Sequence, residues 1–370
     1  MPEISEVNAY SLELPLREPF GTAKGTKTTS PAVIVHLGLS NGVYGLGSAT
    51  PAKYVTAEDT ASVLSAIELC APDLVGLDAA AYLPIFGMLG EVLPHAHSAR
   101  AALEIAVLDA FCKLYDLPMC KFLGGALPQV ETDITIPFVG SEAARELAQQ
   151  AASRGFKHLK IKIGSHDPED DLARVLGASE GAPHCSIRLD ANQGFTPTVA
   201  VRFAGKIQEA GVKIDLFEQP VDRRDLDGLR YVTQNTSVPI FADESAVTPS
   251  DVLKLIELEA VDGINVKLMK CGLSGALDII AMCKAARQEL MLGCMVETGI
   301  GLAAAVHLAC GTGAFSRIDL DAHMLVSPDS GLSSGGFTHN GPVLIADSTA
   351  PGHGSALATT PELVPSQPRT

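Results

Sequence analysis

Apolar and ionisable positions alternate along residues 158–164, which is the pattern of a short buried strand. Lys160 and Lys162 share one face of this strand and aliphatic side chains occupy the other, because strand side chains alternate in direction. Two ammonium groups on one inward face are costly to bury unless negative groups lie opposite them. The pattern therefore predicts acidic partners elsewhere in the chain.

Six further segments repeat this design at intervals of 24 to 30 residues, the length of one strand followed by one helix. Each is an apolar run that ends in ionisable residues. Apolar strands repeated at this period are typical of a parallel α/β barrel, in which residues at the carboxyl ends of strands converge on one site. The strand-end residues are Asp190, Glu218, Asp243, Lys267, Glu297 and the pair Asp319 and Asp321.

The N-terminal third of the chain follows a different pattern. Loose apolar alternation and an Asn-Gly turn predict a three-stranded antiparallel sheet, and helical periodicity follows it. The expected strands are 3–14, 32–37 and 43–49, and the expected helices are 57–70, 79–91 and 98–115.

These patterns divide the chain into parts. We expect an α+β domain over residues 1–130, completed by roughly 330–347, and a barrel over residues 131–329. Residues 348–370 are rich in Pro, Ser, Thr, Gly and Ala and have no period, so we expect them to be disordered.

Composition narrows the class of protein. The net charge of −16 argues against nucleic acid or an anionic membrane as a partner. Eight cysteines without CxxC spacing suit free thiols in a reducing compartment. The first residues do not resemble a signal peptide, and no apolar run is long enough to span a bilayer. We therefore expect a cytoplasmic enzyme.

Asp190, Glu218 and Asp243 end three successive predicted strands. Any one of them alone could simply cap a helix or lie in a loop. Three carboxylates at one barrel mouth repel one another and need a cation, and an all-oxygen set of ligands selects a hard divalent ion, foremost Mg²⁺. The acids therefore predict a metal site.

Lys162 lies on the strand before the three acids and Lys267 on the strand after them. A lysine acts as a base when its pKa falls from about 10.4 towards 7–8, and we expect Lys160 and the metal to lower the pKa of Lys162. Two opposed bases beside a metal predict removal of a proton α to a carboxylate and its return from the other face. Lys160 and the metal would stabilise the enediolate between the two steps.

These residues resemble the enolase superfamily, in its muconate-lactonising-enzyme subgroup, from about residue 3 to 345. The resemblance implies an α/β fold with a (β/α)₇β modified TIM barrel under an N-terminal α+β capping domain, and a homo-oligomer. It also implies Mg²⁺ on Asp190, Glu218 and Asp243, with Lys162 and Lys267 as the acid/base pair. The motifs are Lys160-Ile-Lys162, Leu189-Asp190-Ala-Asn192-Gln-Gly194, Phe217-Glu218-Gln-Pro220, Ala242-Asp243-Glu244-Ser245, Asn265-Val266-Lys267 and Val296-Glu297-Thr-Gly299.

Asp319-Leu320-Asp321 resembles the Asp-x-Asp motif of dipeptide epimerases, whose two carboxylates accept the free α-ammonium of the substrate. Lys24, in a capping-domain loop, could attract an anionic side chain where that family tends to have an arginine, although a lysine lacks the bidentate grip. A solvated loop lysine is an equal alternative. The substrate contacts implied by the resemblance are Thr135, Lys160, Glu297, Asp319, Asp321, Phe20 and Lys24.

The resulting expectation is a Mg²⁺-dependent isomerase that converts L-Xaa-L-Xaa dipeptides to L-Xaa-D-Xaa by two-base proton abstraction through an enediolate. Muconate cycloisomerase, o-succinylbenzoate synthase and N-acylamino acid racemase are alternatives that keep the chemistry but use substrates without a free ammonium. A non-catalytic barrel that binds a metal or ligand is an alternative of another class. The net charge hints at cationic dipeptides and Lys24 at anionic ones, so the side-chain preference stays open.

Overall fold

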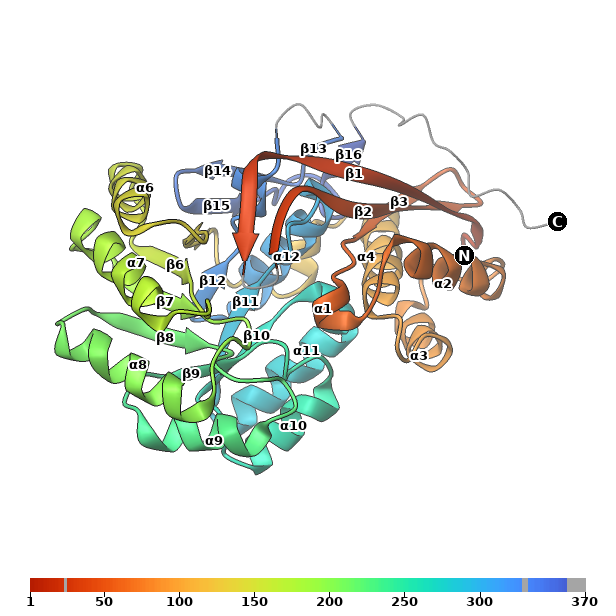
Figure 1. Cartoon of the computed structure of the whole chain (residues 1–370). Helices are drawn as coiled ribbons and strands as arrows, with labels where there is room; N and C mark the ends of the chain where they lie inside the picture. The colour runs from red at the N-terminus through yellow and green to blue at the C-terminus, as the bar shows by residue number, and fades with distance from the viewer. Residues whose placement is uncertain (23–24, 328–331, 358–370) are drawn as a thin grey trace.

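The computed structural model describes residues 1–22, 25–327 and 332–357. Figure 1 shows a barrel of alternating strands and helices with an antiparallel sheet and a group of helices lying beside its mouth. This arrangement confirms the predicted fold class of a barrel with an N-terminal α+β capping domain. In the described part of the chain, no helix is long and apolar enough to cross a membrane.

The N-terminal sheet has the order β1-β2-β3, with both pairs antiparallel, as the alternation predicted. Gly42, in the turn between β2 and β3, has a φ of +85°, which a glycine adopts without strain. The elements are β1 (Ile4–Thr22), β2 (Gly25–Leu39), β3 (Tyr44–Ala49), α1 (Lys53–Thr56), α2 (Thr60–Leu74), α3 (Tyr82–Val92), α4 (His97–Leu114) and α5 (Met119–Phe122).

Helix α4 lies directly on β3, because two glycines leave room for its backbone. A Cβ atom added to Gly45 would lie 1.9 Å from the carbonyl oxygen of Ala106, and one on Gly47 would lie 1.9 Å from that of Ala102. Contacts this close exclude any side chain. The opposite side of α4 packs against α11 of the barrel, so this helix joins the two parts of the molecule.

Eight parallel strands follow one another in sequence order from β5 to β12, and Asp133 N–H donates to the carbonyl of Ile318 across the join between the last and first strands. Seven helices alternate with them, as predicted. The strands are β5 (Ile134–Ile136), β6 (His158–Lys162), β7 (Ser186–Asp190), β8 (Ile214–Glu218), β9 (Ile240–Ala242), β10 (Gly263–Val266), β11 (Glu289–Gly293) and β12 (Arg317–Asp319). The helices are α6 (Ser141–Ser153), α7 (Pro168–Gly181), α8 (Pro197–Glu209), α9 (Leu226–Asn235), α10 (Pro249–Glu257), α11 (Leu268–Ala286) and α12 (Gly299–Thr312).

After the short α13 (Ala322–Leu325), the chain returns to earlier elements. Strand β15 pairs with β4 at the start of the barrel, and Leu332 packs against Leu14, Ala32 and Ile34 of the N-terminal sheet. The remaining elements are β4 (Val130–Glu131), β13 (Ser333–Gly335), β14 (Phe337–Asn340), β15 (Val343–Ala346) and β16 (Ser355–Leu357).

The expected disorder from residue 348 onwards is wrong for residues 348–357. Strand β16 pairs with β13, and the backbone of Gly352 bonds to Leu117 and Met119. The N–H of His353 donates to the buried carboxylate of Asp109 at 2.9 Å. Backbone groups make most of these bonds, so composition gave no sign of them. Residues 358–370 lie outside the described residues.

Candidate active site

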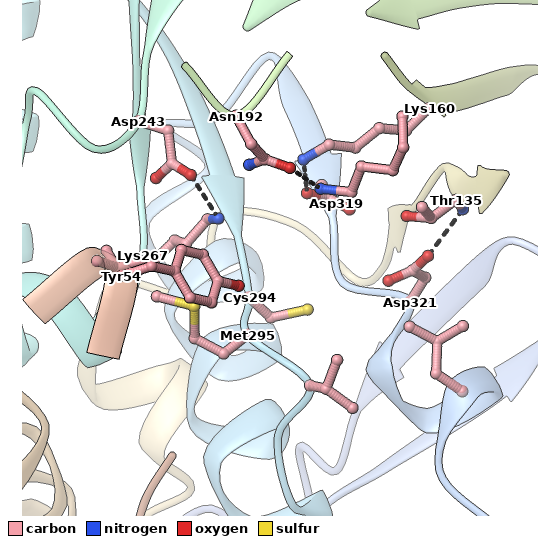
Figure 2. A pocket seen from close by; sticks show the side chains of 14 residues that line it. Tyr54, Thr135, Lys160, Asn192, Asp243, Lys267, Cys294, Met295, Asp319 and Asp321 are labelled. Carbon is pink, nitrogen blue, oxygen red and sulfur yellow. Dashed lines mark hydrogen bonds and ion pairs between the residues drawn. The ribbon is translucent and has the colours of Figure 1, made fainter. Parts of the chain in front are cut away.

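The ionisable strand ends meet at one end of the barrel. In the parallel register, Lys162 lies beside Asp190, and Asp190 lies beside Glu218. A cavity opens above them, and Figure 2 shows its lining side chains arriving from both halves of the barrel. The predicted residues that line it are Thr135, Lys160, Lys162, Asp243, Lys267, Asp319 and Asp321.

Lys160 is the centre of the charge network. Its ammonium nitrogen lies 2.8 Å from Glu218, 3.1 Å from Asp190 and 2.7 Å from Asp319. Burial disfavours the charged form, but the surrounding carboxylates, Asp190 foremost, raise the pKa of Lys160 well above its ordinary value. Lys160 is therefore a fixed positive charge in this site.

Lys162 and Lys267 each pair with one carboxylate. Lys162 Nζ lies 2.6 Å from Asp190 and 3.1 Å from the side-chain oxygen of Asn192, and Lys267 Nζ lies 2.8 Å from Asp243. Burial opposes the charge on both lysines, yet Asp190 raises the pKa of Lys162 and Asp243 raises that of Lys267. We expected the pKa of Lys162 to be lowered. In this structure, where Lys162 pairs with Asp190, it is raised, so that expectation is wrong. A second cation on Asp190 or Asp243 would weaken these pairings and so lower the pKa of the lysine concerned.

The three candidate metal ligands, Asp190, Glu218 and Asp243, are almost completely buried. Among the described residues, no group of three carboxylate, imidazole or thiol side chains has an arrangement that could hold a metal ion. Ammonium groups pair with these carboxylates instead. Their chemistry nevertheless suits a hard divalent ion: the donors are all carboxylate oxygens, and Lys160 already places one positive charge against two of them. The ion and the lysines would compete for the same oxygens.

The two acids of the Asp-x-Asp motif differ in their partners. Asp319 pairs with Lys160, which lowers its pKa despite burial. Asp321 accepts the backbone N–H of Thr135 at 2.8 Å and has no ion pair with any described residue. Burial and the charge of Asp319 raise the pKa of Asp321 to about 6. Asp321 is thus the acid best placed to accept a cationic group.

Glu297 does not line the cavity with the lysines. It borders a neighbouring cavity with Arg17, Thr298 and His323, and its carboxylate accepts the N–H of Met295 at 2.8 Å. Burial raises its pKa to about 7. The backbone of Phe20 pairs with Lys27 in the N-terminal sheet, and Lys24 lies outside the described residues.

The buried Glu297 predicts a stability effect that depends on pH. Its pKa is raised from 4.5 to about 7 in the folded state, so folding favours the protonated form, and the free energy of unfolding falls as pH rises from about 4.5 to 7. This group accounts for up to about 3 kcal/mol of that fall. Glu297→Gln should make the free energy of unfolding in urea depend less steeply on pH, whereas the exposed Glu146→Gln should leave the slope unchanged. Equal slopes for wild type and Glu297→Gln would contradict this assignment.

The sequence analysis assigned no role in the site to Tyr54, Asn265 or Lys270, although Asn265 belongs to one of the motifs named above. Tyr54, on α1, closes the cavity from the capping side, and burial raises its pKa. Asn265 donates to Glu218 at 2.8 Å and Lys270 donates to Asp243 at 2.7 Å. Asn265 and Lys270 could have been suspected from their spacing around Lys267, but Tyr54 has no local signal because it comes from the other part of the chain.

Comparison with known proteins agrees with this geometry. The model of the mandelate racemase/muconate lactonizing enzyme N-terminal domain matches residues 4–124, and that of the enolase C-terminal domain-like family matches residues 142–360. The chain is 37% identical to the L-Ala-D/L-Glu epimerase of Bacillus subtilis over 92% of its length and 93% of that protein. It is 39% identical to the hydrophobic dipeptide epimerase of Enterococcus faecalis over 86% of its length and 90% of that protein.

A solved structure of dipeptide epimerase from Enterococcus faecalis, complexed with Mg and the dipeptide L-Leu-L-Tyr, superposes with a TM-score of 0.90 at 36% identity. The superposition covers 96% of this chain and 99% of that one. Both family models, the relatives and the barrel with its capping sheet lead to one conclusion. The chain belongs to the enolase-like family of mandelate racemase and muconate lactonizing enzyme.

Proposed function

We propose that the protein is a Mg²⁺-dependent dipeptide epimerase, an isomerase that inverts the α-carbon of the C-terminal residue in L-Xaa-L-Xaa. The observation that carries the proposal is a pair of lysines at the barrel mouth together with an acid, Asp321, that lacks a cationic partner among the described residues. The names of the relatives support it, since those cited above are dipeptide epimerases.

Lys162 and Lys267 are suited to act on opposite faces of one carbon. Lys162 ends β6 and Lys267 follows β10, four strands later in a barrel of eight. Strands four apart lie across a closed eight-stranded barrel from each other. One lysine, as the amine, removes the α-proton, and the other, as the ammonium, returns a proton to the opposite face.

The remaining residues bind the substrate and stabilise the negative charge that develops on it. Asp190, Glu218 and Asp243 would hold Mg²⁺, which when bound supplies positive charge beside the substrate carboxylate. The fixed ammonium of Lys160 stabilises the enediolate as it forms. Asp321, supported by Asp319, accepts the α-ammonium. We also propose substrate contacts for Thr135 in the cavity wall, and for Phe20, Lys24 and Glu297.

Asp321→Asn is predicted to impair dipeptides selectively. The substitution keeps the bond from Thr135 N–H but removes the charge opposite the substrate ammonium, a charge-assisted contact of about 1.5–3 kcal/mol, so kcat/KM should fall roughly 10- to 100-fold. The comparison substrate is the same dipeptide with its N-terminus acetylated. Asp319→Asn is less informative, because it also releases Lys160. An equal loss on both substrates would contradict the assigned role of Asp321.

Exchange in D₂O tests the proposed activity. The protein is incubated with Mg²⁺ and dipeptides that carry acidic, basic, aromatic and aliphatic side chains, and α-deuterium is followed by NMR. Epimerisation of at least one class is expected. Turnover of N-acylamino acids or muconate alone would favour the alternative substrates. Absence of exchange across the library would favour a non-catalytic barrel and end the proposal.

We further propose that the protein acts in the cytoplasm as a homo-oligomer, with no nucleic-acid or membrane partner. The net charge of −16 supports the absence of polyanionic partners. Eight free thiols suit a reducing compartment. Light scattering on the purified protein would give the oligomeric state.

A further inference from the structure

Lys270 is a fully buried lysine that the proposed mechanism does not use. It lies in the first turn of α11, three residues after Lys267, and its exposed fraction is 0%. A lysine in such a place is costly unless every N–H of its ammonium finds an acceptor. Its three acceptors therefore indicate what it does.

The ammonium of Lys270 bonds to Asp243 and Asn265. Its nitrogen lies 2.7 Å from Oδ1 of Asp243, 2.7 Å from the carbonyl oxygen of Asp243 and 2.7 Å from the carbonyl oxygen of Asn265. Three donors meet three acceptors, so the group is saturated. It holds both the backbone and the side chain of Asp243 in one orientation.

The two oxygens of Asp243 consequently have different partners. Oδ1 bonds to Lys270, which is enclosed, and Oδ2 bonds to Lys267, which lines the cavity. A cation that enters from the cavity can compete with Lys267 for Oδ2 while Oδ1 stays on Lys270. The carboxylate therefore keeps its orientation when Lys267 leaves it.

The same lysine reaches a second carboxylate through Asn265. Asn265 gives its backbone carbonyl to Lys270 and donates its side-chain amide to Oε1 of Glu218 at 2.8 Å. By orienting Asn265, Lys270 therefore also positions the carboxylate of Glu218. One buried charge supports two of the three proposed ligands.

The turn that carries Lys270 is held in place by the capping domain. Arg100 of α4 donates to the carbonyl of Cys271 at 3.0 Å, and Glu104 accepts both the N–H and the hydroxyl of Ser274 at 2.9 and 2.7 Å. Gly272, at a φ of +70°, brings the backbone close to the carboxylate of Glu104. These contacts hold the backbone that follows Lys270 against the capping domain.

We infer that Lys270 is a positioning residue, which holds Asp243 directly and Glu218 through Asn265 so that both can bind a divalent cation. The inference rests on the proposed metal site but not on the identity of the substrate. Loss of a residue that hydrogen-bonds to a metal ligand, without binding the metal itself, typically weakens metal affinity 10- to 100-fold. Lys270 is fully buried and does not line the cavity.

Calorimetric titration with Mg²⁺ alone tests the inference. Lys270→Met, similar in length but without charge, should bind Mg²⁺ 10- to 100-fold more weakly than wild type. Cys271→Ala, the matched control, removes a buried thiol next to Lys270 whose hydrogen bond goes to the backbone carbonyl of Lys267 and not to Asp243, so it should bind Mg²⁺ within about twofold of wild type. Lys270→Gln, which keeps N–H donors, should be intermediate and replaces Lys270→Met if that variant does not fold.

Two further measurements separate positioning from general damage. Addition of Mg²⁺ should raise the melting temperature of Lys270→Met by less than it raises that of wild type. Each shift is measured against the same variant without Mg²⁺. Excess Mg²⁺ should restore kcat of Lys270→Met without changing KM for the dipeptide. Equal affinity in wild type and Lys270→Met, or an equal loss in Cys271→Ala, would overturn the inference. Absence of Mg²⁺ binding by wild type would instead overturn the proposed function.

Discussion

Replacement of Lys162 or Lys267 by alanine is expected to abolish epimerisation, with kcat lowered on the order of 10²- to 10⁴-fold. Each lysine serves one face of the α-carbon, and neither can reach the other face because β6 and β10 lie across the barrel. NMR of the two diastereomers in D₂O measures the rate. The exposed Lys254→Ala, on α10, is the control and should retain wild-type turnover.

The single variants also allow a sharper test of the two-base scheme. The lysine that remains can still exchange the α-proton of the diastereomer whose proton faces it. Lys162→Ala and Lys267→Ala should therefore each exchange one diastereomer, and not the same one, without interconverting them. Full turnover by either variant, or exchange of the same diastereomer by both, would contradict the assignment of the lysines to opposite faces.

Removal of the metal is expected to stop both epimerisation and exchange, and return of Mg²⁺ to restore them. Without a divalent cation the carboxylates pair with Lys162 and Lys267 and raise their pKa, so neither amine is available as a base. The activity of EDTA-treated protein before and after addition of Mg²⁺ measures this effect. A melting curve in EDTA is the control for an intact fold. Persistent exchange in EDTA would contradict the metal requirement.

The same competition gives the sign of a pH effect. Because Mg²⁺ takes carboxylates that hold ammonium groups, its binding favours loss of protons from Lys162 and Lys267. Affinity for Mg²⁺ should therefore rise with pH. Titration in buffers of different ionisation enthalpy measures the protons released. Proton uptake, or an affinity that falls as pH rises, would contradict displacement of the lysines.

The sequence by itself determined the fold class and most of the strand-end residues. Apolar strands that repeat at a constant period with helices between them bury both faces in a parallel sheet, and when that sheet closes into a barrel the carboxyl ends of its strands meet at one mouth. Lys160, Lys162, Lys267, Asp319 and Asp321 could be assigned to one mouth for this reason. Residues 32–49 likewise contain the Asn-Gly turn that predicted an antiparallel pair of strands.

Only the tertiary structure decided how these charges pair. The direction of the pKa shifts of Lys162 and Lys267 depends on distances to Asp190 and Asp243 across neighbouring strands, which no spacing along the chain contains. Glu297 does not end its strand, because β11 ends at Gly293, and the loop that follows places Glu297 beside a different cavity.

Tertiary structure also supplied Tyr54 from the capping domain, the enclosed ammonium of Lys270, and the order of residues 348–357. Each of these depends on long-range contacts, whereas sequence periodicity reports only local geometry. The strand repeat thus placed the charged groups at one mouth, and the packing of distant segments determined which groups pair there and which face the cavity.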